Sequence, residues 1–176
     1  MHEELLVPFL KGMIVNVITD TVVGIRLPEL CPLAETYSLE TLMREYMDSD
    51  RSSRGATDFL HAASPSRSRT DRSQKQLVLL EGKFLPKDPF SESVKRFARG
   101  RGWSVPSFED ALRIYPLITH GYFNDSMRSL VFLHEPVKRE VIGISMERGR
   151  VVLTAHKAEP KEGWFCRNTG FVFRLP

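Results

Sequence analysis

Two short apolar runs on either side of a glycine, residues 141–146 and 151–156, constrain the fold of this chain more than any other feature. The loop between them contains Arg148-Gly149, and a glycine there supplies the positive φ that a tight hairpin turn needs. A two-residue loop predicts the pairs Glu147 with Arg150, Met146 with Val151, Ile144 with Leu153, and Ile142 with Ala155. This register gathers the large side chains on one face, and a slip of one residue would exchange the faces. We therefore expect an antiparallel hairpin with one buried face.

The rest of the chain adds strand and helix signals without a regular alternation between them. Further strands are predicted at residues 13–18, 22–27, 76–80, 130–133, 164–167 and 171–175, with turns at residues 19–21 and 168–170. Helices are predicted at residues 39–47 after a cap at Ser38, at residues 89–99 after a cap at Asp88, and through residue 114 from a capping box of Ser107 and Asp110. Because hairpins dominate, we expect an α+β fold with a mainly antiparallel sheet and about three covering helices. The sheet either stays open or curls into a small barrel.

Composition favours one globular domain with one irregular insertion. The 176 residues are 41% apolar, which is enough for one substantial core, so we predict a single domain over residues 1–176. Serine and arginine repeat between residues 48 and 75, and such a segment buries too little apolar surface to offset the entropy of ordering it. We expect a flexible loop there, interrupted by a short apolar island at Phe59–Leu60. Its serines are plausible phosphorylation targets, and its Arg67, Arg69 and Arg72 offer a mobile basic contact.

A cationic segment at residues 95–103 is the strongest functional signal. Its charged and aromatic members, called the basic aromatic patch below, are Lys95, Arg96, Arg99, Arg101 and Trp103. Cations attract phosphates and an exposed tryptophan stacks on bases, so the patch predicts contact with RNA or single-stranded nucleic acid. The alternative is a solvated helix end, in which the cations complement the helix dipole and Trp103 packs in the core. The formal net charge of +3 leaves both interpretations open.

Sequence motifs for catalysis and metal binding are missing. There is no glycine-rich phosphate loop, no His-Glu-x-x-His and no G-x-S-x-G elbow. Two of His120, His134 and His156 together could cleave RNA by acid–base chemistry without a metal. Asp125 and Glu135 add metal-ligand types to His134 and His156, but the sequence does not bring the four together. We predict no cofactor and no metal site, and keep a histidine-pair nuclease as an alternative.

The amino terminus and the cysteines indicate a cytoplasmic or nuclear protein. The chain begins with acidic residues where a secretory signal is basic, and no apolar run approaches the roughly 20 residues that span a bilayer. Cys31 and Cys166 are too few for a disulfide framework, so we expect both to be reduced. No membrane partner is expected.

One stretch near the amino terminus is similar to a known family. Residues 6–27, a short lead-in followed by Gly12 and two β-branched runs around Thr19-Asp20-Thr21, resemble the opening of an Sm-like barrel. No second motif of that family follows later in the chain, and no RNA-contacting residue is carried over from the resemblance.

These features predict a non-enzymatic binding subunit of a larger assembly, which contacts RNA or single-stranded nucleic acid through the basic aromatic patch. A protein-interaction adaptor is the first alternative, with an exposed strand edge or the helix at residues 38–47 as its docking element. A metal-independent nuclease that uses a histidine pair is the second.

Overall fold

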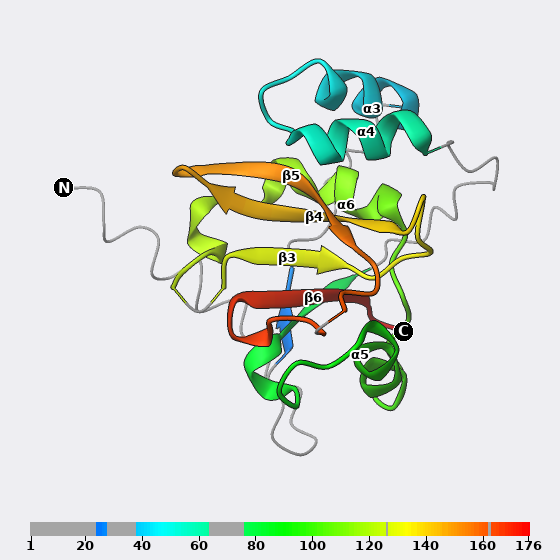
Figure 1. Ribbon diagram of the computed structural model, residues 1–176, viewed down its shortest axis with the longest axis vertical. Coiled ribbons are helices and arrows are strands. Elements are labelled where there is room, and N and C mark those ends of the chain that lie inside the picture. The colour runs from blue at the N-terminus through cyan, green and yellow to red at the C-terminus, as the bar shows by residue number, and fades with distance from the viewer. Residues whose placement is uncertain (1–23, 28–37, 64–75, 126, 162) are drawn as a thin grey trace.

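In the part of the chain that the structure describes, six strands form one sheet in the order β1-β2-β6-β3-β4-β5 (Figure 1). The computed structural model describes residues 24–27, 38–63, 76–125, 127–161 and 163–176. The strands are β1 (Gly24–Arg26), β2 (Leu77–Glu81), β3 (Ser129–Phe132), β4 (Glu140–Glu147), β5 (Arg150–Lys157) and β6 (Thr169–Arg174). Neighbouring strands are antiparallel except β3 and β6, which run parallel.

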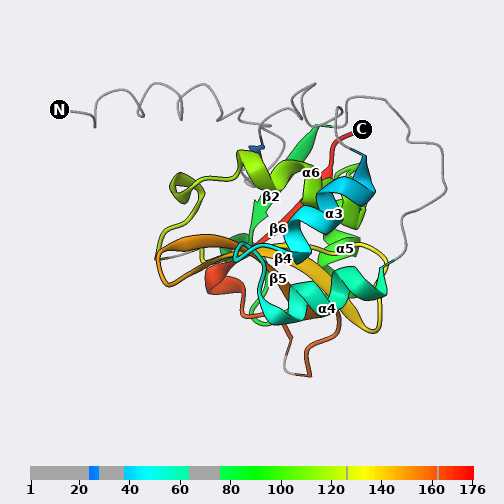
Figure 2. The ribbon, with the colours of Figure 1, turned by 90° about the horizontal axis from the view of Figure 1, so that it is seen from above.

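Four α-helices accompany this sheet within the described residues: α3 (Leu39–Met47), α4 (Arg54–Ala62), α5 (Ser91–Arg99) and α6 (Phe108–Ile114). Figure 1 places α3 and α4 beyond β5 and α5 at the opposite end of the molecule, and Figure 2 shows α3 between α4 and α6. Four single-turn 3₁₀ helices join the longer elements: η1 (Gly82–Phe84), η2 (Tyr115–Leu117), η3 (His120–Tyr122) and η4 (Cys166–Asn168).

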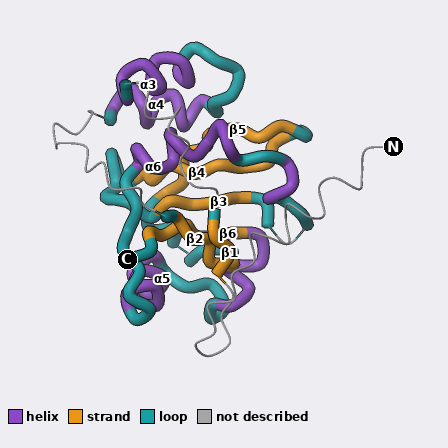
Figure 3. The backbone as a smooth tube through the Cα atoms, turned by 180° about the vertical axis from the view of Figure 1, so that it is seen from behind, coloured by secondary structure: helices purple, strands orange, loops and turns teal. Residues whose placement is uncertain are grey.

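The predicted α+β class with a mainly antiparallel sheet is confirmed, with four helices in place of about three. The alternative of a small barrel is wrong, because β1 and β5 end the strand order and do not pair with each other. Figure 3 shows the strands as one open sheet. The hairpin predicted at residues 13–27, which carries the Sm-like resemblance, lies outside the described residues except for β1 and Leu27.

Serine caps begin two of the helices as predicted. The hydroxyl of Ser38 accepts a hydrogen bond from the backbone amide of Thr41, in the first turn of α3. Ser107 forms a reciprocal capping box with Asp110 at the start of α6. The cap predicted at Asp88 is wrong, because α5 begins later, at Ser91.

The hairpin of β4 and β5 has the predicted register. Glu147 pairs with Arg150, Met146 with Val151, Ile144 with Leu153, and Ile142 with Ala155. The turn residues Arg148 and Gly149 have φ angles of 49° and 76°, as a type I′ turn requires. Ile142, Ile144 and Leu153 all enter the hydrophobic core on one face of the sheet, so a slip of one residue would move them out of it.

The last strand differs from the prediction of a carboxy-terminal hairpin. Residues 164–167 form no strand, and β6 runs between β2 and β3, antiparallel to the first and parallel to the second. Val172 enters the core under α3, α4 and α6, whereas Phe171 and Phe173 enter a second core under α5. Because both faces of the sheet are covered here, β6 is apolar along most of its length rather than alternating.

The apolar faces of helices α3 and α5 are buried in the two hydrophobic cores. The apolar face of α3 is buried, at Leu39, Leu42, Met43 and Tyr46. The second core, on the other face of the sheet, contains Val94 and Ala98 of α5 together with Trp103 and Trp164. Helix α3 therefore presents no open apolar face for docking a partner.

Residues 48–75 are not a flexible loop throughout. Helix α4 occupies the middle of this segment, and the Phe59–Leu60 island is buried in the larger core. Just before α4, the amide of Ser53 donates to the carbonyl of Leu153 and the carbonyl of Arg51 accepts from the amide of Leu153, each at 2.8 Å. The prediction of a loop is wrong for residues 54–62, where the apolar island packs in the core as part of a helix, and the chain before this helix covers the outer edge of β5 at Leu153. Residues 64–75 lie outside the described residues.

Gly143, in the middle of β4, is required by its neighbours. A Cβ at this position would lie 2.6 Å from Nε2 of His156 and 2.8 Å from the carbonyl oxygen of Leu130. A backbone carbonyl cannot move aside as a flexible side chain can. We expect Gly143→Ala to lower the free energy of unfolding by about 1–3 kcal/mol in urea titrations. Gly121→Ala is the control, since its Cβ would meet only Thr119 Oγ1 at 3.7 Å. Equal effects of the two changes would contradict the packing of the His156 ring over β4.

Candidate binding groove

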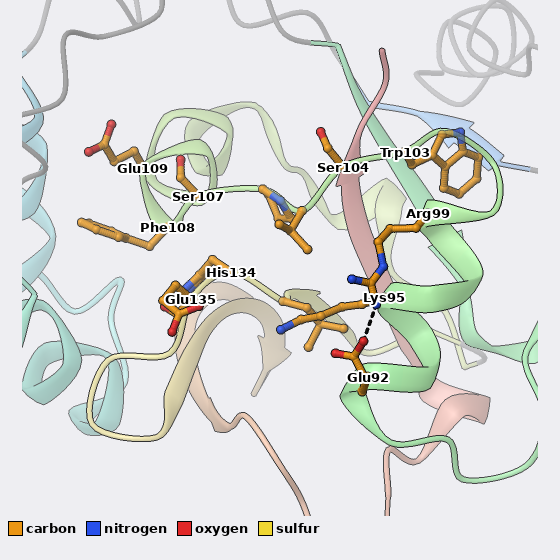
Figure 4. Close-up of a pocket in the computed structure, with 13 residues that line it drawn as sticks. Glu92, Lys95, Arg99, Trp103, Ser104, Ser107, Phe108, Glu109, His134 and Glu135 are labelled. Atoms are coloured by element: carbon orange, nitrogen blue, oxygen red, sulfur yellow. Dashed lines mark hydrogen bonds and ion pairs between the residues drawn. The ribbon is translucent and has the colours of Figure 1, made fainter.

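An open groove of about 650 Å³ lies between α5 and the chain that enters α6, with the end of β3 at its base (Figure 4). One wall is α5, through Glu92, Lys95 and Arg99. The other wall and the floor come from residues 103–109 and from residues 133–135, which follow β3. Two neighbouring stretches of the chain, residues 92–99 and 103–109, therefore meet a third from later in the sequence, residues 133–135.

The α5 wall follows from helical spacing. Glu92, Lys95 and Arg99 are three and then four residues apart, which places them on one face of the helix. Val94 and Ala98, on the opposite side, are buried in the second core and fix this orientation. Figure 4 shows an ion pair between Glu92 and Arg99, whereas Lys95 reaches from the helix towards the facing wall.

The facing wall is held by the end of β6. Arg174 Nε donates to Asp110 Oδ2 at 2.6 Å and its Nη2 donates to Ser107 Oγ at 3.0 Å. The backbones of Ser104 and Arg174 also exchange two hydrogen bonds, of 3.0 and 2.9 Å. One strand end thereby fixes both the chain before α6 and the cap of that helix. Val105, which lies between these anchors, keeps 43% of its surface exposed in the groove.

His134 closes the base of the groove as a neutral, fully bonded side chain. Its Nε2 accepts from the amide of Ile142 at 2.9 Å, so the proton is on Nδ1, which donates to the carbonyl of Glu135 at 2.6 Å. Burial lowers the pKa of His134, and the nearby Lys95 ammonium lowers it further. The ring continues the β3–β4 ladder past the last backbone pair, which makes this histidine structural.

The basic aromatic patch does not have the exposed tryptophan that base stacking requires. Trp103 is only 6% exposed and packs against Phe173, with ring centroids 6.3 Å apart. The expectation of an exposed Trp103 is wrong, and its alternative, a tryptophan in the core, is correct. The ring is buried because the chain turns back at Gly102, whose φ is +76°, towards the end of β6.

The cations of the patch point to different places. Lys95 and Arg99 line the groove, Arg96 is exposed outside it, and the guanidinium of Arg101 lies over the ring of Phe97 at 4.2 Å. The basic residues predicted further upstream, Arg67, Arg69 and Arg72, lie outside the described residues, as does Cys31.

The three candidate histidines are not brought together. The His134 ring packs edge-on against Phe59 in the larger core, whereas the His156 ring packs edge-on against Trp164 in the second core, on the other face of the sheet. Nε2 of His120 lies 2.7 Å from the carbonyl oxygen of Gly149, in the hairpin turn. That turn lies at the far end of β4 from Val141, the partner of His156, which at strand spacing is roughly 20 Å away. No two of these histidines can act on one phosphate in this arrangement.

Metal and membrane chemistry find no support in the described part of the chain. Within it, no group of three or more histidine, cysteine, aspartate or glutamate side chains is placed to hold a metal ion, and Asp125, Glu135 and the histidines do not converge. None of its helices is both long and apolar enough to cross a membrane.

Sequence reasoning singled out five residues of the groove for other roles but did not bring them together: Lys95, Arg99, Trp103, His134 and Glu135. The segments that carry Glu109, Glu135 and Val105 are brought together by the pairing of β6 in the sheet. The sequence pattern predicted the wrong partner for this strand. The spacing of Glu92, Lys95 and Arg99 was the one available signal, since it places three charges on one helix face. Comparisons of the chain with protein-family models, with curated proteins and with solved structures found no match.

Burial of His156 gives the fold a measurable pH dependence. Desolvation lowers its pKa from 6.5 to about 4, while Nε2 lies 2.9 Å from Thr154 Oγ1. Because the unfolded chain binds this proton more readily, the stabilisation is complete above pH 6.5 and is lost as the pH falls towards 4. Between pH 7 and pH 5 we expect wild type to lose about 2 kcal/mol more unfolding free energy than His156→Phe. Parallel pH profiles of the two proteins in urea titrations would contradict a buried neutral His156.

Proposed function

We propose that the protein is a non-enzymatic binding module that takes an extended segment of a partner protein into the groove. The observation that carries this proposal is the chemistry of the groove, where an apolar floor lies between two charged walls. Val105, which is 43% exposed, and the partly exposed Phe108 supply the accessible apolar surface, and the flanking charges are of both signs. Its volume of about 650 Å³ is in the range of sites that bury a few side chains or a small ligand.

The groove favours a peptide over a nucleic acid. Three carboxylates, those of Glu92, Glu109 and Glu135, line it with only two cations, Lys95 and Arg99. A polyanion would be repelled by this surplus of negative charge. Contact with RNA or single-stranded nucleic acid remains a second candidate at the outer side of α5, where Arg96 is exposed and Arg101 stacks on Phe97. That surface lacks the base-stacking contribution of Trp103, so we expect such binding to be weak and strongly dependent on salt.

The adaptor function therefore uses a different surface from the two that the sequence suggested. The apolar face of the helix at residues 38–47 is buried, and the outer edge of β5 is bonded at Leu153 by the chain before α4. In the groove, by contrast, Val105 and the charged side chains around it remain accessible together.

Selection of a random peptide library on the purified full chain tests the proposal. We expect enriched peptides that bind in solution and lose about tenfold or more in affinity, roughly 1.4 kcal/mol, when Val105→Arg places a bulky charge in the groove. Phe165→Arg is the matched control, because Phe165 is 62% exposed and does not line the groove.

Failure to enrich any peptide, or peptides that bind the Val105→Arg variant as tightly as wild type, would overturn the proposal. Labelled single-stranded RNA, titrated at several salt concentrations, separates the second candidate. Tight binding that is lost in Arg96→Ala and Arg101→Ala, together with no peptide enrichment, would favour nucleic-acid binding.

A further inference from the structure

The two walls of the groove carry net charges of opposite sign. On α5, Glu92 and Arg99 form an ion pair and neutralise each other. Lys95 lies between them, and no described residue forms an ion pair with it. The net charge of the α5 wall is therefore the positive charge of Lys95, which Figure 4 shows reaching into the groove.

The facing wall is negative. Glu109, in the first turn of α6, and Glu135, after β3, both line the groove, and neither has an ion-pair partner among the described residues. The third carboxylate on this side, that of Asp110, faces away and is bound by Arg174. Figure 4 shows Glu109 and Glu135 on the side of the groove opposite α5.

We propose that the groove selects its partner segment by charge polarity, with an acidic side chain placed against Lys95 and a basic side chain against Glu109 and Glu135. This inference rests on the proposed function and names the kind of segment that the groove accepts. A segment with both charges satisfies both walls, whereas a segment with charges of one sign is attracted by one wall and repelled by the other. At an interface, a contact between like charges costs more free energy than one favourable ion pair contributes. The order of the charges along the segment therefore sets specificity.

The apolar floor strengthens this selection. Val105 lies between the charged walls with 43% of its surface exposed, and a partner side chain packed on it removes water from the groove. Charge pairs at the edge of a dehydrated contact interact more strongly than fully solvated pairs. The expected segment therefore carries an apolar residue near its acidic and basic residues.

Charge-swap variants in the same peptide selection test the inference. Wild type is expected to enrich peptides that contain an acidic and a basic residue at a fixed separation. Lys95→Glu should replace the acidic preference by a basic one, and Glu109→Lys combined with Glu135→Lys should replace the basic preference by an acidic one. For one enriched peptide, exchanging its acidic residue for lysine should weaken binding to wild type about tenfold or more, and Lys95→Glu should recover most of that loss.

Lys87→Glu is the matched control, because Lys87 is exposed, undergoes the same change of charge and does not line the groove. It should leave the wild-type preference intact. Enriched peptides without a paired acid and base, or an unchanged preference in Lys95→Glu, would overturn the polarity inference while the groove remains a peptide site. If no peptide is enriched by any of these proteins, the proposed function itself fails.

Discussion

The pairing of β6 between β2 and β3 is the constraint on which the rest of the structure depends. It joins the strands that precede α5 to the hairpin of β4 and β5, and it separates the two hydrophobic cores. Because both faces of β6 are covered, its Phe171, Val172 and Phe173 are all fully buried. Without this strand the sheet would be two unconnected parts, and the groove wall that carries Val105 would lose its anchor.

The end of β6 also positions one wall of the groove. Arg174 leaves the sheet and binds the capping box of α6, so the wall that carries Val105 and Glu109 is set by the last strand of the chain. The α5 wall is set separately, by the burial of Val94 and Ala98 on the other side of the helix. The buried histidine of the groove has a hydrogen-bond partner at each ring nitrogen, and the accessible groups of the groove are charged side chains and the apolar surface of Val105.

Sequence reasoning was most successful where local pattern decides the structure. The register of β4 and β5 follows from alternating apolar residues and one turn glycine, and the caps at Ser38 and Ser107 follow from side chains that bond the next turn. It failed for β6, whose parallel partner β3 lies about forty residues earlier, because a long-range pairing leaves no local periodic signal. For the same reason the sequence left the burial of Trp103 as one of two alternatives, since its neighbour Phe173 belongs to β6.

The candidate site was predictable only in part. Lys95 and Arg99 were identified as cations, but a count of charges cannot show that Arg99 is paired with Glu92 while Lys95 faces carboxylates from other segments.

The most direct test of the central claim is a double-mutant cycle between Asp110 and Arg174, measured by urea unfolding. The account predicts a coupling energy of about 1–3 kcal/mol between Asp110→Asn and Arg174→Met. Additive effects of the two changes would contradict the attachment of the groove wall to the end of β6.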